Sequence, residues 1–202
     1  MISAGIVGGI GPESTVDYYR AILASCRRRA PDAPAPSLII NSIDLDHALS
    51  LLNEGRVDAL TAYLIPEIER LAAAGATFGL LAANTPHLVF DALSAQVSLP
   101  LVSIVEATRE EASRLGMTRV GLLGTRFTMA GTFRPETRAR ILAVIGRLVA
   151  DEGIDGVILG GTELPLLLRG HDVASAPFLD TTLLHVEAVV TRLLAGEGSR
   201  HA

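Results

Sequence analysis

Residues 4–15, Ala-Gly-Ile-Val-Gly-Gly-Ile-Gly-Pro-Glu-Ser-Thr, join a short apolar run to a cluster of glycines and a polar stretch. The apolar run is typical of a buried strand, and Pro12 suits the first turn of a helix. Between them, Gly8, Gly9 and Gly11 permit backbone angles that other residues avoid. The stretch therefore predicts a strand, a tight loop and a helix.

This strand and helix pattern recurs along the chain. After the first apolar run at 4–7, further short runs occur at 38–41, 78–82, 101–103, 119–123 and 156–159. Amphipathic helical patterns occupy residues 12–29, 46–52, 57–74, 85–95, 104–115, 134–152 and 181–195. Buried strands that alternate with helices are typical of a parallel sheet covered on both faces, so the predicted fold class is α/β.

Certain strand ends resemble each other, which indicates an internal duplication. Residues 4–15 resemble 119–131 (RVGLLGTRFTMAG), and residues 78–87 (FGLLAANTPH) resemble 156–165 (GVILGGTELP). We therefore predict two α/β halves, 1–115 and 116–202, with a C-terminal helix that can pack back on the first half. Two such halves usually form a ligand crevice between them, where the carboxyl ends of the parallel strands open.

The second half is shorter than the first. Gly5 and Ala83 are 78 positions apart, whereas the matching residues Gly121 and Gly161 are 40 positions apart. The shortfall of 38 residues is about the size of one strand, one helix and their loops. Either an element has been lost or a segment is absent from the sequence, and both interpretations stay open.

Composition excludes several classes of function. The net charge of -5 and the isoelectric point near 5.5 argue against a nucleic-acid partner. No apolar run reaches the roughly 18 to 20 residues that cross a membrane, and the first residues lack a charged leader, so a cytoplasmic protein is expected.

Two residue types limit the chemistry further. All 17 residues counted as Lys or Arg are arginine, so no lysine can form a Schiff base with pyridoxal phosphate, and no cofactor is predicted. Cys26 is the single cysteine, which excludes an internal disulfide and a zinc site built on several thiolates; no metal is predicted. Cys26 is expected on the apolar side of the first helix, with Val16, Tyr19 and Leu23.

Several turns after strands carry small polar groups that can donate hydrogen bonds to a carboxylate without adding charge. They are Asn84 with Thr85, Gly160 and Gly161 with Thr162, and Gly124 and Thr125 with Thr128. Each hydroxyl can instead cap a helix, but three convergent turns favour binding. The glycine loop at 8–11 lacks the spacing of a dinucleotide motif and is interpreted either as a site for a small carboxylate or as a requirement of tight packing.

Two ionisable residues follow these turns. Glu163 and His87 can act as general acid or base, or can be helix-start residues with a structural role. His185 lies in an amphipathic helical pattern and is expected to be a packed histidine.

Five blocks of the sequence together resemble the aspartate/glutamate racemase family. They are GIVGGIGPESTVDYY from residue 5, ANTPH from 83, GLLGTRFTM from 121, GGTELPLL from 160 and FLDTTLLHVEAV from 178. Members are two-domain α/β proteins, typically dimeric, that invert the α-carbon of an amino acid without a cofactor. The resemblance thus implies a homodimer that binds a small carboxylate or amino acid.

The resemblance also implies the substrate-binding positions. They correspond to Ile10, Thr15, Ser42, Asn84, Thr85, Thr125, Thr128 and Thr162. The family mechanism uses two cysteines on opposite faces of the substrate, one directly before the Asn-Thr pair and one directly before the Thr-Glu pair. Those positions are Ala83 and Gly161 here, and neither side chain carries a proton.

Three hypotheses follow. The chain is an isomerase of altered activity in which His87 or Glu163 moves the proton, or a non-catalytic carboxylate-binding homologue. The third is a different cofactor-free reaction on a carboxylate, such as decarboxylation or lyase chemistry, in which a polar pocket stabilises an enolate-like charge.

Overall fold

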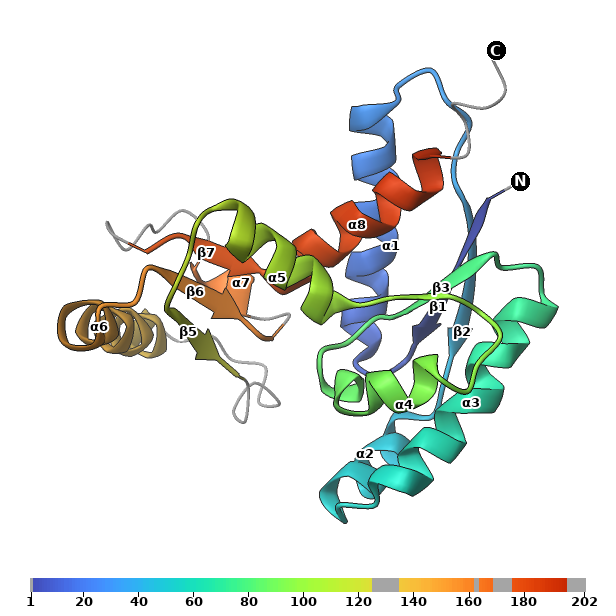
Figure 1. Ribbon diagram of the computed structural model, residues 1–202, viewed down its shortest axis with the longest axis horizontal. Coiled ribbons are helices and arrows are strands. Elements are labelled where there is room, and N and C mark those ends of the chain that lie inside the picture. The colour runs from blue at the N-terminus through green and yellow to red at the C-terminus, as the bar shows by residue number, and fades with distance from the viewer. Residues whose placement is uncertain (1, 125–134, 162–163, 169–175, 196–202) are drawn as a thin grey trace. The chain divides into compact units, whose positions relative to one another are not determined.

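The computed structural model describes residues 2–124, 135–161, 164–168 and 176–195. The chain divides into two compact units, one of Met1–Ile104 with His185–Ala202 and one of Val105–Leu184. Each unit has a parallel sheet with flanking helices (Figure 1). The α/β fold class predicted from the sequence is confirmed.

The first unit contains a four-stranded parallel sheet in the order β2-β1-β3-β4. Its elements are β1 (Ser3–Gly8), α1 (Pro12–Arg29), β2 (Ser37–Ser42), α2 (Leu45–Asn53), α3 (Val57–Ala73), β3 (Phe78–Leu81), the 3-10 helix η1 (Thr85–Val89), α4 (Phe90–Ser94), β4 (Leu101–Val102) and most of α8 (Thr181–Ala195). Because all four strands are parallel, their carboxyl ends lie at one edge of the sheet.

Helices cover both faces of this sheet. Successive side chains of β1 point to opposite faces, so alternate residues pack against different helices. Ala4 and Ile6 pack in one buried cluster with residues of α1 and α8. Val7 packs in a separate cluster with residues of α2, α3 and α4. Two apolar clusters, one on each face, therefore enclose the sheet.

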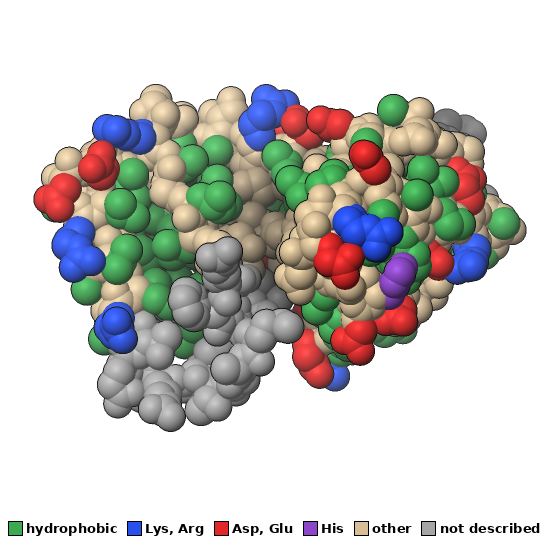
Figure 2. Space-filling view, turned by 90° about the horizontal axis from the view of Figure 1, so that it is seen from below, with side chains coloured by type: hydrophobic (Ala, Val, Ile, Leu, Met, Phe, Trp, Pro, Cys, Tyr) green, Lys and Arg blue, Asp and Glu red, His purple; other side chains and the backbone are tan. Residues whose placement is uncertain are grey.

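A polar contact joins α1 to α8, which lie side by side (Figure 1). Glu187 accepts a hydrogen bond from Ser25 at 2.7 Å and pairs with Arg28 at 2.6 Å and Arg29 at 3.3 Å. Arg28 and Arg29 thus serve the contact between two helices. In the face shown by Figure 2, basic and acidic side chains are interspersed, without one large basic patch.

The buried face of α1 differs from the one expected from the sequence. Cys26 is buried, but Val16 and Tyr19 are 43% and 44% exposed. The buried stripe instead includes Tyr18 and Ile22, each four residues from the next along the helix. The prediction of the apolar side was wrong because α8 packs against the stripe that contains Tyr18.

The second unit has a three-stranded parallel sheet in the order β5-β6-β7. Its elements are α5 (Ile104–Arg114), β5 (Val120–Leu123), α6 (Pro135–Glu152), β6 (Gly156–Leu159), α7 (Leu164–Leu168) and β7 (Phe178–Asp180), with the first residues of α8. The order β5-β6-β7 corresponds to β1-β3-β4 of the first unit. Among the described residues, the second unit has no counterpart of β2.

Some short elements were not predicted from the sequence. β7 and α7 contain three and five residues, too few to show a hydrophobic period. The single helix expected at 85–95 is a 3-10 helix followed by a short α-helix. Within the described ranges, no helix has the length and apolar character needed to span a bilayer.

Candidate functional site

The carboxyl ends of β1 and β3 are held together at one edge of the first sheet. The Val7 carbonyl accepts a hydrogen bond from the Ala82 N–H at 2.9 Å. The buried hydroxyl of Ser14, in the first turn of α1, donates to the Ala82 carbonyl at 2.7 Å. The glycine loop after β1 and the turn after β3 are therefore fixed next to each other.

The glycine loop has a conformation that its packing requires. Gly9 has a φ of +87°, and a Cβ at this position would lie 2.4 Å from the Ile43 carbonyl oxygen. The Gly9 N–H donates to the Thr15 hydroxyl at 2.9 Å. Gly11 also has a positive φ, +91°, but a Cβ on Gly11 would lie 3.7 Å from its nearest neighbour, the Ser14 Cβ. Close packing thus requires glycine at position 9, whereas a Cβ on Gly11 would make only an ordinary van der Waals contact with Ser14.

The structure brings three further predicted residues to this loop. Thr15 holds the loop through its hydroxyl. Ser42, exposed at the end of β2, has its hydroxyl oxygen 2.9 Å from where a Cβ on Gly9 would be. Ile10 is only 8% exposed and packs in the same apolar cluster as Val7 and Ala83. Ile10, which is itself part of the loop, therefore anchors the loop in this apolar cluster.

Asn84 and Thr85 follow β3 at the same edge. Asn84 is half-buried and occupies the N-cap position of η1, but its side chain makes no capping hydrogen bond. Thr85 is exposed as the first residue of η1.

His87 is fixed to the backbone by both ring nitrogens. The Ile104 N–H donates to its Nε2 at 3.2 Å, so Nδ1 carries the proton and donates to the Ala83 carbonyl at 2.9 Å. Burial lowers the pKa of His87 to about 4, although its hydrogen bonds with the backbone of Ala83 and Asn84 oppose this shift. His87 is therefore a neutral imidazole at neutral pH, and it braces the turn that contains Ala83 and Asn84.

His185 lies against His87, at 5.8 Å between ring centroids. Its Nε2 donates to the Val102 carbonyl at 2.9 Å, and its Nδ1 accepts from the Tyr18 hydroxyl at 2.8 Å. Burial lowers the pKa of His185 to about 3, opposed by the hydrogen bond to Val102 and reinforced by the charge that His87 can take up. The expectation of a packed histidine is confirmed, because His185 is fully buried.

The other predicted positions belong to the second half. Gly161 is buried just beyond β6, and its carbonyl accepts from the Leu164 N–H at 3.2 Å. Thr125, Thr128, Thr162 and Glu163 lie outside the described residues. In the part of the chain that the structure describes, no group of three or more His, Cys, Asp or Glu residues could hold a metal ion.

The sequence alone did not reveal the cluster of Tyr18, His185 and His87. The two histidines are 98 positions apart, and no local period connects them. Ser14 was also missed, because a serine in a first helical turn looks like any other polar residue there. No sequence signal at Ser14 or at the two histidines would have identified their hydrogen-bond partners.

In α/β proteins with parallel sheets, the loops at the carboxyl ends of the strands are the usual place for a small-ligand site. The sequence model of the Asp/Glu/hydantoin racemase family matches residues 7–134 and 129–189. This chain is therefore a member of the Asp/Glu/hydantoin racemase family.

Solved structures agree with this assignment. A Yersinia pestis protein assigned as an Asp/Glu racemase is 28% identical, with a TM-score of 0.87 over 96% of this chain and 100% of that one. An aspartate racemase homologue from Pyrococcus horikoshii is 32% identical, with a TM-score of 0.81 over 96% and 99%. Arylmalonate decarboxylase, at 17% identity and a TM-score of 0.51 over 95% and 92%, shares the fold.

Proposed function

We propose that this chain is a carboxylate-binding member of the racemase family in which racemisation by two thiols has been lost. The ligand is a small amino acid or dicarboxylate, held at the carboxyl edge of the first sheet. Ala83 is the observation that carries the proposal. Its methyl group is buried at the end of β3, where the resemblance to the family implies the first proton-carrying thiol.

The surroundings of Ala83 support the proposal. His87, the candidate proton carrier among the described residues, has both ring nitrogens in backbone hydrogen bonds and a pKa far below neutral. A general base is most effective with a pKa near the working pH and a free lone pair aimed at the substrate. We therefore propose that His87 positions the Ala83 and Asn84 backbone. Glu163 stays a prediction as a proton carrier.

The ligand-binding half of the proposal depends on groups that do not need a thiol. Gly11 directly precedes an 18-residue helix, whose first N–H groups favour an anion. Asn84, Thr85 and Ser42 add polar side chains at the same edge. This arrangement supports recognition of a carboxylate and leaves the chemistry of the α-carbon unassisted by cysteine.

Proton exchange at the α-carbon tests the proposal directly. The protein is incubated in D₂O with each enantiomer of aspartate and glutamate, the α-proton is followed by NMR, and binding is measured by calorimetry. We expect binding without exchange above a buffer control. Exchange well above the control would contradict the loss of racemisation, and release of carbon dioxide or ammonia from a bound acid would favour decarboxylase or lyase chemistry instead.

A matched pair of variants tests the position of the ligand. Asn84→Ala should weaken binding by about ten- to a hundredfold, since a hydrogen bond to a charged group contributes about 1.5 to 3 kcal/mol. Asn53→Ala, at the exposed end of α2, should leave binding unchanged. Equal affinities for the two variants would show that the ligand lies elsewhere. A homodimer and a cytoplasmic location stay predictions.

A further inference from the structure

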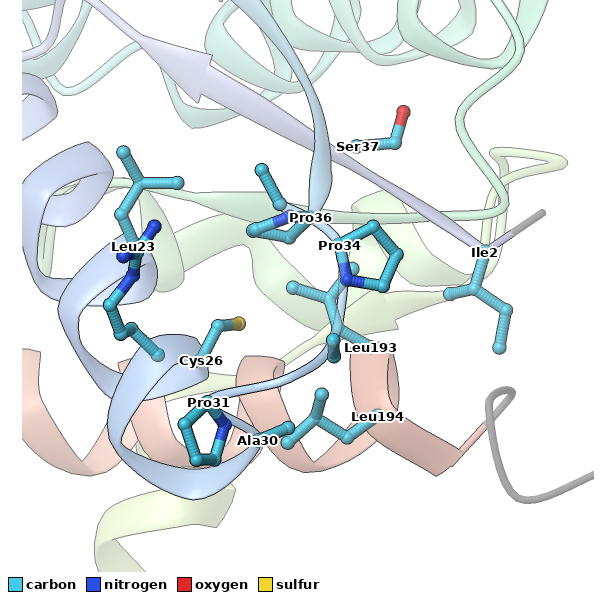
Figure 3. Close-up of a pocket in the computed structure, with 13 residues that line it drawn as sticks. Ile2, Leu23, Cys26, Ala30, Pro31, Pro34, Pro36, Ser37, Leu193 and Leu194 are labelled. Carbon is cyan, nitrogen blue, oxygen red and sulfur yellow. The ribbon is translucent and has the colours of Figure 1, made fainter.

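A separate cavity lies at the amino ends of β1 and β2, at the edge of the first sheet opposite to the candidate site (Figure 3). Its volume is about 240 Å³. One wall comes from Leu23 and Cys26 of α1, and another from Leu193 and Leu194 of α8. The lining is thus mainly apolar, and none of it belongs to the site at the carboxyl edge.

The connection between α1 and β2 explains why this space is open. Residues 30–36 contain prolines at 31, 34 and 36, which fix φ and lack a backbone N–H. The intervening Ala30, Ala33 and Ala35 carry only a methyl group each, so no long side chain of this segment fills the space. A cavity framed by prolines and two packed helices is largely preformed, and a ligand need not order it.

Among the described residues, Arg27 is the one charged residue that lines this cavity. Its neighbours Arg28 and Arg29 pair with Glu187, whereas Arg27 has no carboxylate partner within the described residues. Arg27 is exposed and extends from the last turn of α1. An apolar cavity with one unpaired cation at its mouth is complementary to an apolar chain with an anionic end.

We propose that the cavity binds a short aliphatic carboxylate, with its chain between α1 and α8 and its headgroup at Arg27. At roughly 30 Å³ for each water-sized group, 240 Å³ accommodates roughly eight such groups. Octanoate therefore matches the space. This proposal does not depend on the proposed function, because none of the residues involved belongs to the carboxyl edge of the sheet.

Octanoate titration, followed by NMR of ¹³C-labelled Leu and Ile methyl groups, tests the proposal. We expect saturable shifts at Leu23, Leu193 and Leu194. Hexanoate should bind more weakly, with about a fourfold loss for each methylene removed, which corresponds to about 0.8 kcal/mol per buried methylene. The absence of saturable shifts at these methyl groups would overturn the proposal. Shifts that appear on dilution without octanoate would assign the cavity to a second copy of the chain and would also contradict it.

Variants separate the headgroup from the chain. Arg27→Gln should weaken octanoate about fivefold, as expected for an exposed ion pair, and should leave 1-octanol unchanged. Arg20→Gln, also exposed on α1, is the matched control and should have no effect. Ala33→Leu should fill the cavity and block the binding of both octanoate and 1-octanol. If Ala33→Leu does not fold, the comparison of wild type with Arg27→Gln still tests the proposal. Equal octanoate binding by wild type and Arg27→Gln would show that the site does not select a carboxylate.

Discussion

Ala83 and Gly161 occupy the two positions where the family resemblance implies the proton-carrying thiols. Ala83 is 8% exposed, and its carbonyl is already held by His87. A cysteine side chain placed there would project from a backbone that is fixed in position. In the proposed function, racemisation is lost because Ala83 and Gly161 carry no thiol, while the turn after β3 is still held in place.

Restoring both thiols tests this explanation. The double variant Ala83→Cys, Gly161→Cys should exchange the α-proton of a bound amino acid in D₂O above the rate of the wild type. The reason is that a thiolate and a thiol supply the base and the acid that the wild type lacks. Each single variant is the control and should exchange less than the double variant. A double variant that binds the amino acid but exchanges no faster than buffer would show that the two positions do not flank an α-carbon.

The paired histidines predict how stability depends on pH. His87 and His185 have pKa values of about 4 and about 3 in the folded chain, below the value of 6.5 for an ordinary histidine. At pH values between these folded pKa values and 6.5, the unfolded chain binds more protons than the folded chain. The contribution of the two histidines to the free energy of unfolding should therefore be complete above pH 6.5 and should be lost as the pH decreases. The limiting slope is about 1.4 kcal/mol per pH unit for each histidine.

Urea unfolding between pH 5 and 7.5 measures this slope. His185→Gln should reduce it towards the contribution of one histidine. His47→Gln changes an exposed histidine on α2 and should leave it unaltered. A wild-type stability that does not change between pH 5 and 6.5 would show that the two imidazoles are not held neutral.

At the scale of elements, the strand, loop and helix at residues 3–29 show what the sequence could predict. The apolar run, the glycines and Pro12 were sufficient for β1, the loop and α1, because these signals are local. The rotation of α1 was not predictable, since it depends on contacts with α8, 150 or more positions away along the chain. The same holds for the candidate site. Asn84 could be chosen as a candidate because it directly follows a predicted strand, whereas the hydrogen-bond partners of His87 could not be predicted.

Two glycine variants separate backbone strain from close packing in the loop. Gly9→Ala and Gly11→Ala both place a side chain at positive φ, which costs about 1 to 2 kcal/mol. Gly9→Ala also brings its Cβ to 2.4 Å from the Ile43 carbonyl, so an overpacking cost of about 1 to 3 kcal/mol is added. Urea unfolding should therefore show a larger loss for Gly9→Ala. A larger loss for Gly11→Ala would contradict the loop geometry.

At the scale of the whole molecule, the two sheets differ in the strand that lies outside the first one. The first sheet has β2 outside β1, whereas β5, the counterpart of β1, has no outer neighbour among the described strands. The shortfall of 38 residues in the second half was visible in the sequence, and it falls where a counterpart of β2 would be. The two segments matched by the family model overlap at residues 129–134, within this interval. Spacing alone could not show which strand would be left at an edge.

Within the described strands β5 lies at the edge of its sheet, and this position predicts self-association. Leu122 is 69% exposed on this strand, and an edge strand presents unpaired backbone groups beside such a side chain. Leu122→Thr should therefore lower the tendency of the protein to associate at high concentration, as measured by light scattering over a dilution series, with little change in unfolding free energy because the side chain is already in water. Leu88→Thr, at 68% exposure on η1, is the matched control and should have a smaller effect. Equal effects of the two variants would attribute the association to exposed apolar area in general, and the β5 edge would have no special role.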